Sequence, residues 1–164
     1  MSLRRAGEAD RALIENLFNL YRNDISAYCD DFRFVDKDGY FDPGIAGEIL
    51  PFGDGVETYI IVDRGRNVGL ITVTDKQYAL EGCDWRFQEL YLIRPARGRG
   101  LARAAAGQLL KEKGGRWCLS VYKQNLPARR FWDAFIRENG TLLLTMPGEE
   151  GMTDIVFDSK QEKQ

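Results

Sequence analysis

Residues 87–102 read FQELYLIRPARGRGLA, an apolar run followed by a turn rich in arginine and glycine. A short apolar run, Leu90–Ile93, is bounded by Pro95 and predicts a buried strand. The turn Arg97–Gly100 holds two glycines, which let the backbone approach a ligand closely, and the alanine- and leucine-rich segment Leu101–Lys113 predicts a helix. A strand, a glycine turn and a helix N-terminus direct free N–H groups and the positive end of the helix dipole at one point. The stretch therefore predicts an anion site.

The charge and spacing of this turn suit phosphate, but two common phosphate motifs fit it poorly. Three arginines (Arg94, Arg97 and Arg99) add positive charge. A P-loop needs Gly-Lys-Ser/Thr, whereas Gly100 is followed by Leu-Ala, and a dinucleotide fingerprint would place Gly or Ala where Arg103 stands. A solvated turn is the alternative interpretation, because glycine spacing alone is a weak signal.

Two short motifs, which follow one another along the chain, resemble those of a known protein family. The spacing Arg97-x-x-Gly100-x-Ala102 resembles the Gln/Arg-x-x-Gly-x-Gly/Ala signature of the GNAT acetyltransferase superfamily, and it stands directly after the predicted strand. The downstream segment 125–131, NLPARRF, resembles the family's Asn-x-x-Ala-x-x-Phe pattern. The resemblance covers residues 57–160, while the N-terminal third fits the family only by position and pattern.

The resemblance implies an α/β fold with a mixed, mostly antiparallel sheet, a splayed parallel pair of central strands and flanking helices. It implies acetyl-CoA as co-substrate, with the pyrophosphate on the N–H groups of the turn and the pantetheine arm along the preceding strand. The N–H of Leu92 would polarise the thioester carbonyl. The cofactor contacts that it implies are Tyr91, Leu92, Ile93, Arg97, Gly98, Arg99, Gly100, Leu101, Ala102, Asn125 and Phe131.

One position departs from the family pattern. Many GNAT enzymes have a tyrosine directly after the phenylalanine of the second motif, and its hydroxyl can protonate the departing thiolate. This sequence has Trp132 there. An indole N–H donates a hydrogen bond but delivers no proton near neutral pH. Acetyl transfer stays feasible, because a thiolate with a pKa near ~8.5 is a tolerable leaving group.

Composition excludes several kinds of chemistry. The 164 residues contain no histidine, which excludes zinc sites and nucleophilic catalysis that depend on histidine. Cys29, Cys83 and Cys118 are widely spaced and predict neither a disulfide framework nor a metal site. No apolar run is long enough to span a membrane, and the N-terminus lacks the apolar core of a signal peptide, so we expect a cytoplasmic protein without bound metal.

Charge is distributed unevenly. Residues 94–130 contain ten Lys or Arg and one acid, which suits a polyanionic cofactor, whereas residues 24–57 contain nine Asp or Glu and two bases. The acidic segment, which we name the acceptor-side segment, would attract a cationic amine, or it is simply a solvated loop. Tyr40, Phe41 and Phe52 would line its pocket or anchor the loop. Nucleic-acid binding is disfavoured, because the basic block lacks interleaved aromatics.

The remaining pattern predicts a single domain, 1–164, with a cofactor-binding core at 85–137. An antiparallel meander should precede one β-helix-β crossover, followed by a helix and two strands. The predicted helices are Glu8–Tyr21, Leu101–Lys113 and Leu126–Glu138. The predicted strands are Ser2–Ala6, Glu57–Asp63, Asn67–Asp75, Trp85–Ile93, Trp117–Tyr122, Thr141–Met146 and Met152–Phe157.

Two residues are candidates for proton transfer. Glu89 shares a strand face with Tyr91, and a carboxylate between apolar neighbours is costly to bury without a role or a partner. Tyr122 ends a predicted strand and offers a hydroxyl in place of the missing tyrosine. The sequence therefore favours acetyl transfer from acetyl-CoA to a primary amine in a ternary complex, with a non-catalytic acyl-CoA-binding module as the alternative. The acceptor's identity and the oligomeric state, a homodimer included, stay open.

Overall fold

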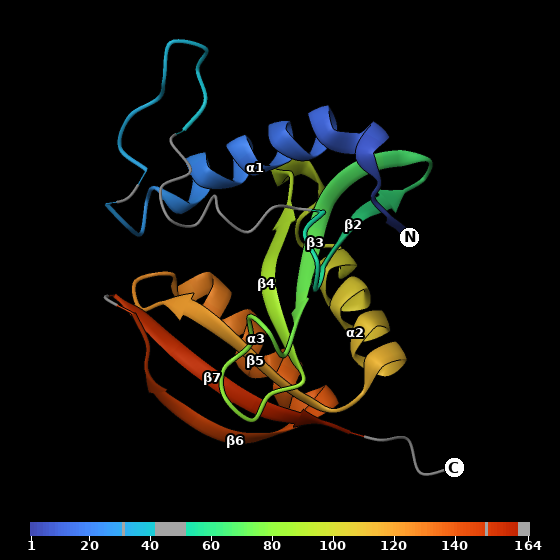
Figure 1. Ribbon diagram of the computed structural model, residues 1–164, viewed down its shortest axis with the longest axis vertical. Helices are drawn as coiled ribbons and strands as arrows, with labels where there is room; N and C mark the ends of the chain where they lie inside the picture. The colour runs from blue at the N-terminus through green and yellow to red at the C-terminus, as the bar shows by residue number, and fades with distance from the viewer. Residues whose placement is uncertain (31, 42–51, 150, 161–164) are drawn as a thin grey trace.

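The computed structural model describes residues 1–30, 32–41, 52–149 and 151–160. Its centre is one seven-stranded sheet in the order β1-β2-β3-β4-β5-β7-β6 (Figure 1). All neighbouring strands are antiparallel except β4 and β5. The strands are β1 (Ser2–Arg5), β2 (Val56–Asp63), β3 (Arg66–Asp75), β4 (Trp85–Leu92), β5 (Arg116–Tyr122), β6 (Gly140–Pro147) and β7 (Met152–Ser159). The predicted fold class is confirmed.

Helices cover both faces of the sheet. Helices α2 (Leu101–Lys113) and α3 (Leu126–Asn139) pack on one face, where Leu109, Phe135 and Trp117 are fully buried in the main hydrophobic core. Helix α1 (Arg11–Ile25) packs on the opposite face against Leu70 and Tyr91. Side chains of successive strand residues point to opposite faces, so β3 serves both cores.

Helix α1 differs from its prediction at both ends. Residues Glu8–Asp10 form a 3-10 turn, in which the Asp10 carboxylate accepts the N–H of Gly7, so the α-helix begins only at Arg11. At the other end the helix continues one turn beyond Tyr21, because the buried Ile25 extends its apolar face. This extra turn carries Asp24, a residue that matters for the site. The helix Leu101–Lys113 is confirmed at both ends.

The parallel strands β4 and β5 pair at only two positions, Trp85 with Trp117 and Arg86 with Cys118. Beyond them the strands diverge, so the sheet divides into a β1–β4 half and a β5–β7–β6 half (Figure 1). A β-bulge contributes: the adjacent residues Thr72 and Val73 of β3 pair with Glu89 and Phe87, so Gln88 is the extra residue. Bulges bend and twist the strand that carries them.

Candidate active site

The divergence of β4 and β5 leaves the β5-facing edge of β4 beyond Arg86 without a strand partner among the described residues. The N–H of Ile93 donates to the carbonyl of Val68 on the β3 side, at 2.9 Å. N–H groups of successive strand residues alternate between the two edges, so the N–H of Leu92 faces the β5 side. Because β4 and β5 no longer pair at this level, this N–H is directed into the space between the strands.

A second set of N–H groups lies at the end of this strand. Gly98 and Gly100 have φ of +73° and +76°, and the next residue, Leu101, begins α2. The first helical N–H groups have no partner within a helix, and no hydrogen bond among the described residues uses the N–H of Gly98, Arg99 or Gly100. A Cβ on either glycine would meet nothing within 4 Å, so the space above the turn is open to an anion.

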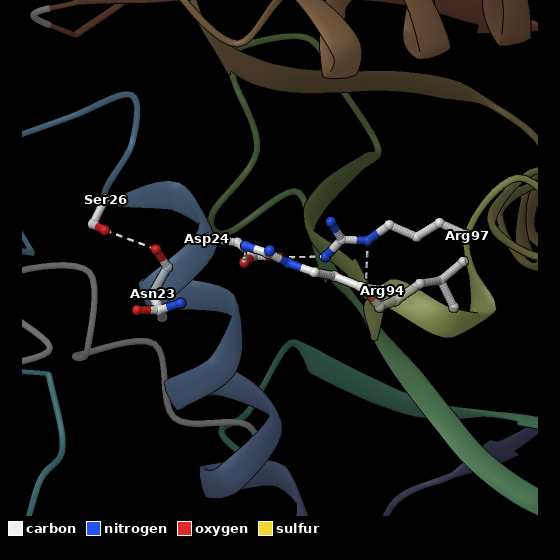
Figure 2. Close-up of polar contacts among 6 residues, drawn as sticks. Asn23, Asp24, Ser26, Arg94 and Arg97 are labelled. Atoms are coloured by element: carbon white, nitrogen blue, oxygen red, sulfur yellow. Dashed lines mark hydrogen bonds and ion pairs between the residues drawn. The ribbon is translucent and has the colours of Figure 1, made fainter.

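The side chains of the turn arginines contact acids of the protein. Arg97 donates from Nε to the carbonyl of Leu92 (2.9 Å) and from Nη2 to Asp24, with its guanidinium 5.5 Å from the Tyr91 ring centre. Arg94 donates to the other oxygen of Asp24 at 2.9 Å (Figure 2). Arg99 donates to Asp63 at 2.7 Å. These acids offset the side-chain charge, so the predicted anion site would depend more on the backbone N–H groups than the sequence suggests.

Asp24 joins the end of α1 to the turn after β4 (Figure 2). Burial would raise the pKa of this carboxyl, but the hydrogen bonds from Arg97 and Arg94 outweigh that effect and hold the pKa below its usual value of 3.8. A depressed pKa means that the ionised form stabilises the fold above pH 3.8 and that this stabilisation is lost as pH falls through the lower, folded-state value.

We predict that Asp24→Asn lowers the free energy of unfolding at pH 7 by about 1 kcal/mol, since two partly exposed ion pairs are lost. The difference from wild type should shrink as pH falls below 3.8, where Asp24 is protonated in the unfolded chain. Urea unfolding at several pH values measures both. Asp133→Asn, which removes an exposed pair with Arg129 on α3, is the matched control. A pH-independent difference would contradict the ion-pair assignment.

Glu89 follows the bulge on β4 and lies on the α1 face, as Tyr91 does. Its side chain is only partly exposed. Burial raises the pKa of Glu89 to about 7, against the opposing effects of a hydrogen bond from Tyr21 and of the positive charges of Arg86 and Arg22. A carboxyl with a pKa near 7 exists in both forms at neutral pH, so it can take up a proton and release it again.

A polar network fixes Arg86 beside Glu89. Arg86 donates from Nη2 to the hydroxyl of Ser120 (2.8 Å), which donates to Asp154 (2.5 Å). Asp154 is buried, with 8% of its surface exposed, and it belongs to β7, so the network crosses the divergence between the two halves of the sheet. The charge of Arg86 is thereby held in place near the carboxyl whose ionised form it favours.

Comparison with known proteins rests on structure alone, because no protein-family model and no curated protein matches the sequence. An acetyltransferase from Thermus thermophilus superposes with a TM-score of 0.68, at 18% identity over 95% of this chain and 96% of that one. A GNAT-family acetyltransferase from Streptococcus agalactiae superposes with a TM-score of 0.64, at 18% identity over 99% and 96%.

A third similar structure was solved with a bound ligand. A Salmonella typhimurium protein solved with its cofactor acetyl-CoA has a TM-score of 0.61, at 19% identity over 100% of this chain and 96% of that one. This chain has the GNAT fold. The divergence of β4 and β5 and the glycine turn before α2 therefore occur in a fold for which a solved complex with acetyl-CoA exists.

The second GNAT motif begins α3. The Asn125 side chain caps the helix by accepting the N–H of Ala128 at 3.2 Å. Phe131 is partly buried, and its ring lies 5.0 Å from that of Trp132. Trp132, the residue at the tyrosine position of the GNAT pattern, is 8% exposed and packs its ring 5.1 Å from Phe87. The departure thus places a large aromatic side chain in the core, next to the point where β4 and β5 separate.

The acceptor-side segment contacts α1 where the structure describes it. Tyr40 donates its hydroxyl to Asn16 at 3.3 Å, the N–H of Phe41 donates to Asn19, and the guanidinium of Arg11 lies 5.3 Å from the Phe52 ring centre. Several of its acids have cationic partners: Asp30 pairs with Arg33, Asp38 with Lys37 and Glu57 with Lys113. Residues 31 and 42–51 of the segment lie outside the described part of the chain.

Sequence reasoning missed two residues of the site, Tyr21 and Asp24. Tyr21 falls one turn after Leu17 on the apolar face of α1, a position that sequence analysis assigns to packing alone. Asp24 belongs to the acidic segment, where its charge suggests a role in attracting an amine. Both lie on α1 and contact the β4 strand or its following turn. A helical reading extended to Ile25 would have placed both on the sheet side.

The described residues contain no group of three or more His, Cys, Asp or Glu side chains arranged to hold a metal ion. None of their helices combines the length and the apolar character needed to cross a bilayer.

Proposed function

We propose that this protein transfers the acetyl group of acetyl-CoA to a primary amine, by direct attack in a ternary complex. The observation that carries the proposal is the separation of β4 and β5 directly beside Glu89, whose pKa is about 7. The separation leaves the N–H of Leu92 directed into the space where a thioester carbonyl would accept it. A carboxyl and a carbonyl-polarising donor on one strand are what aminolysis of a thioester requires.

For the cofactor, we propose that the pyrophosphate binds the N–H groups of Gly98–Ala102 and that the pantetheine arm lies along Tyr91–Ile93. Support comes from the positive φ of both glycines and from the open space above them. Asn125 caps the N-terminus of α3 and Phe131 lies in the second turn of this helix, which follows β5, and both would form the opposite wall. Arg97 and Arg99 would supply further charge, in exchange with their present partners Asp24 and Asp63.

The proposed chemistry transfers one acetyl group and removes two protons from the acceptor nitrogen. Glu89 accepts the first proton from the ammonium and passes it to solvent, and the neutral nitrogen attacks the thioester carbon. The C–S bond then breaks to release the CoA thiolate, and the second proton of the nitrogen reaches that thiolate directly or through the Tyr122 hydroxyl, which gives a proton to sulfur and regains one from nitrogen. Tyr122 ends β5 and lies near enough to Tyr21 to affect its ionisation. Arg86 and Arg22 favour ionised Glu89, and positioning alone contributes roughly 7–11 kcal/mol.

A coupled assay tests this function. The protein is incubated with acetyl-CoA and a panel of diamines, polyamines, amino acids and peptides with free N-termini, while free thiol is monitored and the products are identified by mass spectrometry. We expect thiol release and acetamide formation in equal amounts for at least one amine. The excess of acidic residues in the acceptor-side segment favours a cationic acceptor, although several of those acids already have partners. Thiol release without an acetylated product would contradict the proposal.

The alternative is an acyl-CoA-binding module without catalysis. Trp132 favours it, because a buried indole stands where many GNAT enzymes have a proton-donating tyrosine. Saturable acetyl-CoA binding without turnover of any amine across the panel would support this alternative over the enzyme.

A further inference from the structure

Strand β6 forms one edge of the sheet and exposes a run of apolar side chains. It is the last strand in the order β1-β2-β3-β4-β5-β7-β6 and lies at the lower margin of Figure 1. Leu142, Leu143 and Leu144 follow one another in it, with 56%, 44% and 47% of their surfaces exposed. Among the described residues, no other strand has a large apolar side chain that is exposed. Adjacent exposed leucines are typical of a surface that another molecule covers.

The edge of β6 carries no charge that would keep another strand away. An edge strand directs unpaired backbone N–H and C=O groups outward, and proteins guard such an edge with charged residues, a bulge, proline or a short strand. At the opposite edge of the sheet, β1 has four residues, of which Arg4 and Arg5 are charged. β6 has eight residues, GTLLLTMP. Its guards are a bulge, which leaves Leu143 without a partner in β7, and Pro147 at its end. Neither places a charge beside the leucines.

The sequence of β6 is suited to pairing with itself. Residues 141–145 read TLLLT, which is the same in both directions about Leu143. In an antiparallel pair of two β6 strands centred on Leu143, each leucine opposes a leucine and Thr141 opposes the partner's Thr145. Opposed threonines can hydrogen-bond, and opposed leucines remove each other's apolar surface from water. Because β6 contains no charged residue, no like charges meet in this pair.

We propose that β6 is a dimer interface, at which two copies of this chain pair their β6 strands antiparallel about a two-fold axis at Leu143. The pairing joins the two sheets into one and covers the leucines of both copies. It is closed, because both β6 edges are used and the edges that remain, both β1, are short and carry arginines. Assembly therefore ends at two copies. β5 and β7 separate β6 from β4 in the sheet, so this surface is distinct from the proposed catalytic groups.

Sedimentation velocity over a wide range of protein concentrations tests the proposal. We expect wild type to change from monomer to dimer as the concentration rises, without larger species. Leu143→Lys should weaken the dimer by about tenfold or more, or ~1.4 kcal/mol, because it sets two ammonium groups opposite each other at the two-fold axis. Leu20→Lys is the matched control and should leave the dimer unchanged, since Leu20 is a similarly exposed leucine (49%) on α1.

Mixing two variants tests the register. Leu143→Glu alone should be monomeric, for the same reason as Leu143→Lys. An equimolar mixture of the two should form heterodimers, because residue 143 faces its own counterpart at the axis and the opposed charges then attract.

A cross-link tests the same register without a change of charge. With oxidised glutathione as the oxidant, Leu143→Cys should form a disulfide between two copies, because opposed Cα atoms of an antiparallel pair lie about 4.5–5.5 Å apart, within the range of a disulfide. Thr141→Cys is the matched control and should cross-link far less, because it opposes the partner's Thr145. Wild type controls for Cys29, which is partly exposed.

Each outcome bears on the proposal alone, because no readout involves acetyl transfer. A wild type that stays monomeric at every concentration, or a dimer that Leu143→Lys leaves intact, would overturn it. Assemblies that grow steadily with concentration would contradict the closed pair, and a mixture of the two charged variants that stays monomeric would contradict the two-fold axis at Leu143. If circular dichroism shows that Leu143→Lys is unfolded, the Leu143→Cys cross-link decides, and its absence would equally overturn the proposal.

Discussion

Glu89→Gln should lower kcat for amine acetylation by about 10²- to 10⁴-fold, the usual contribution of general-base catalysis, and should leave the affinity for acetyl-CoA unchanged. Glutamine keeps the shape of the side chain, but it cannot take a proton from the ammonium. Steady-state kinetics with the best amine, together with calorimetric titration of acetyl-CoA, measures the two effects separately.

The pH profile identifies the role of Glu89 more sharply than the rate alone. Because its pKa is about 7, wild-type kcat/KM should fall as pH decreases through 7, where the carboxyl becomes protonated. The Glu89→Gln profile should lose this limb and rise with pH, as bulk solvent supplies more neutral amine. Glu89→Asp is the control that keeps an ionisable carboxyl. A rise in the KM for the amine with unchanged kcat would show instead that Glu89 binds the acceptor.

Gly100→Asp should weaken acetyl-CoA binding by a hundredfold or more. The added side chain would point into open space above the turn, where we place the pyrophosphate. Two like charges about 4 Å apart repel by about 4 kcal/mol at an effective dielectric constant of 20, and a hundredfold loss corresponds to about 2.7 kcal/mol. Calorimetric titration of the variant measures the affinity, and thermal unfolding shows whether the variant is folded.

Backbone strain is separated from charge by Gly100→Asn. Residue 100 has a φ of +76°, and asparagine and aspartate tolerate this region similarly, so the asparagine variant has the same shape without the charge. We expect it to lose much less affinity than the aspartate variant. Equal affinities of the wild type and of the asparagine and aspartate variants for acetyl-CoA would contradict the placement of the cofactor at this turn.

Much of the fold follows from patterns local to the chain. The segment Leu101–Lys113 is bounded by glycines on both sides, which is why both ends of α2 agree with the prediction. The bulge at Gln88 is not predictable in the same way, because it is defined by which β3 residues oppose it. The bulge precedes Glu89, so Glu89 and Tyr91 still share a face as their spacing predicts.

In the candidate site, too, some features follow from local sequence and others depend on distant elements. The glycine turn is visible in the sequence, since positive φ favours glycine at both positions. The partners of its arginines are not visible, because Asp24 and Asp63 come from other elements and nothing local to the turn indicates them. The contact between the rings of Tyr21 and Tyr91 is likewise a product of how α1 packs on the sheet. Sequence therefore predicts which groups are available, and packing decides which of them meet.

The short pairing of β4 with β5 leaves few backbone hydrogen bonds between the two halves of the sheet. Two paired positions do not set the angle between the two halves of the sheet, so this angle depends on the side chains packed where the strands separate. There the Phe87 ring stacks on Trp117 at 4.3 Å and lies 6.3 Å from Phe135, edge-on. A change of side-chain volume among these rings should therefore alter the angle between the two halves of the sheet, and with it the separation of β4 from β5 at the level of Leu92.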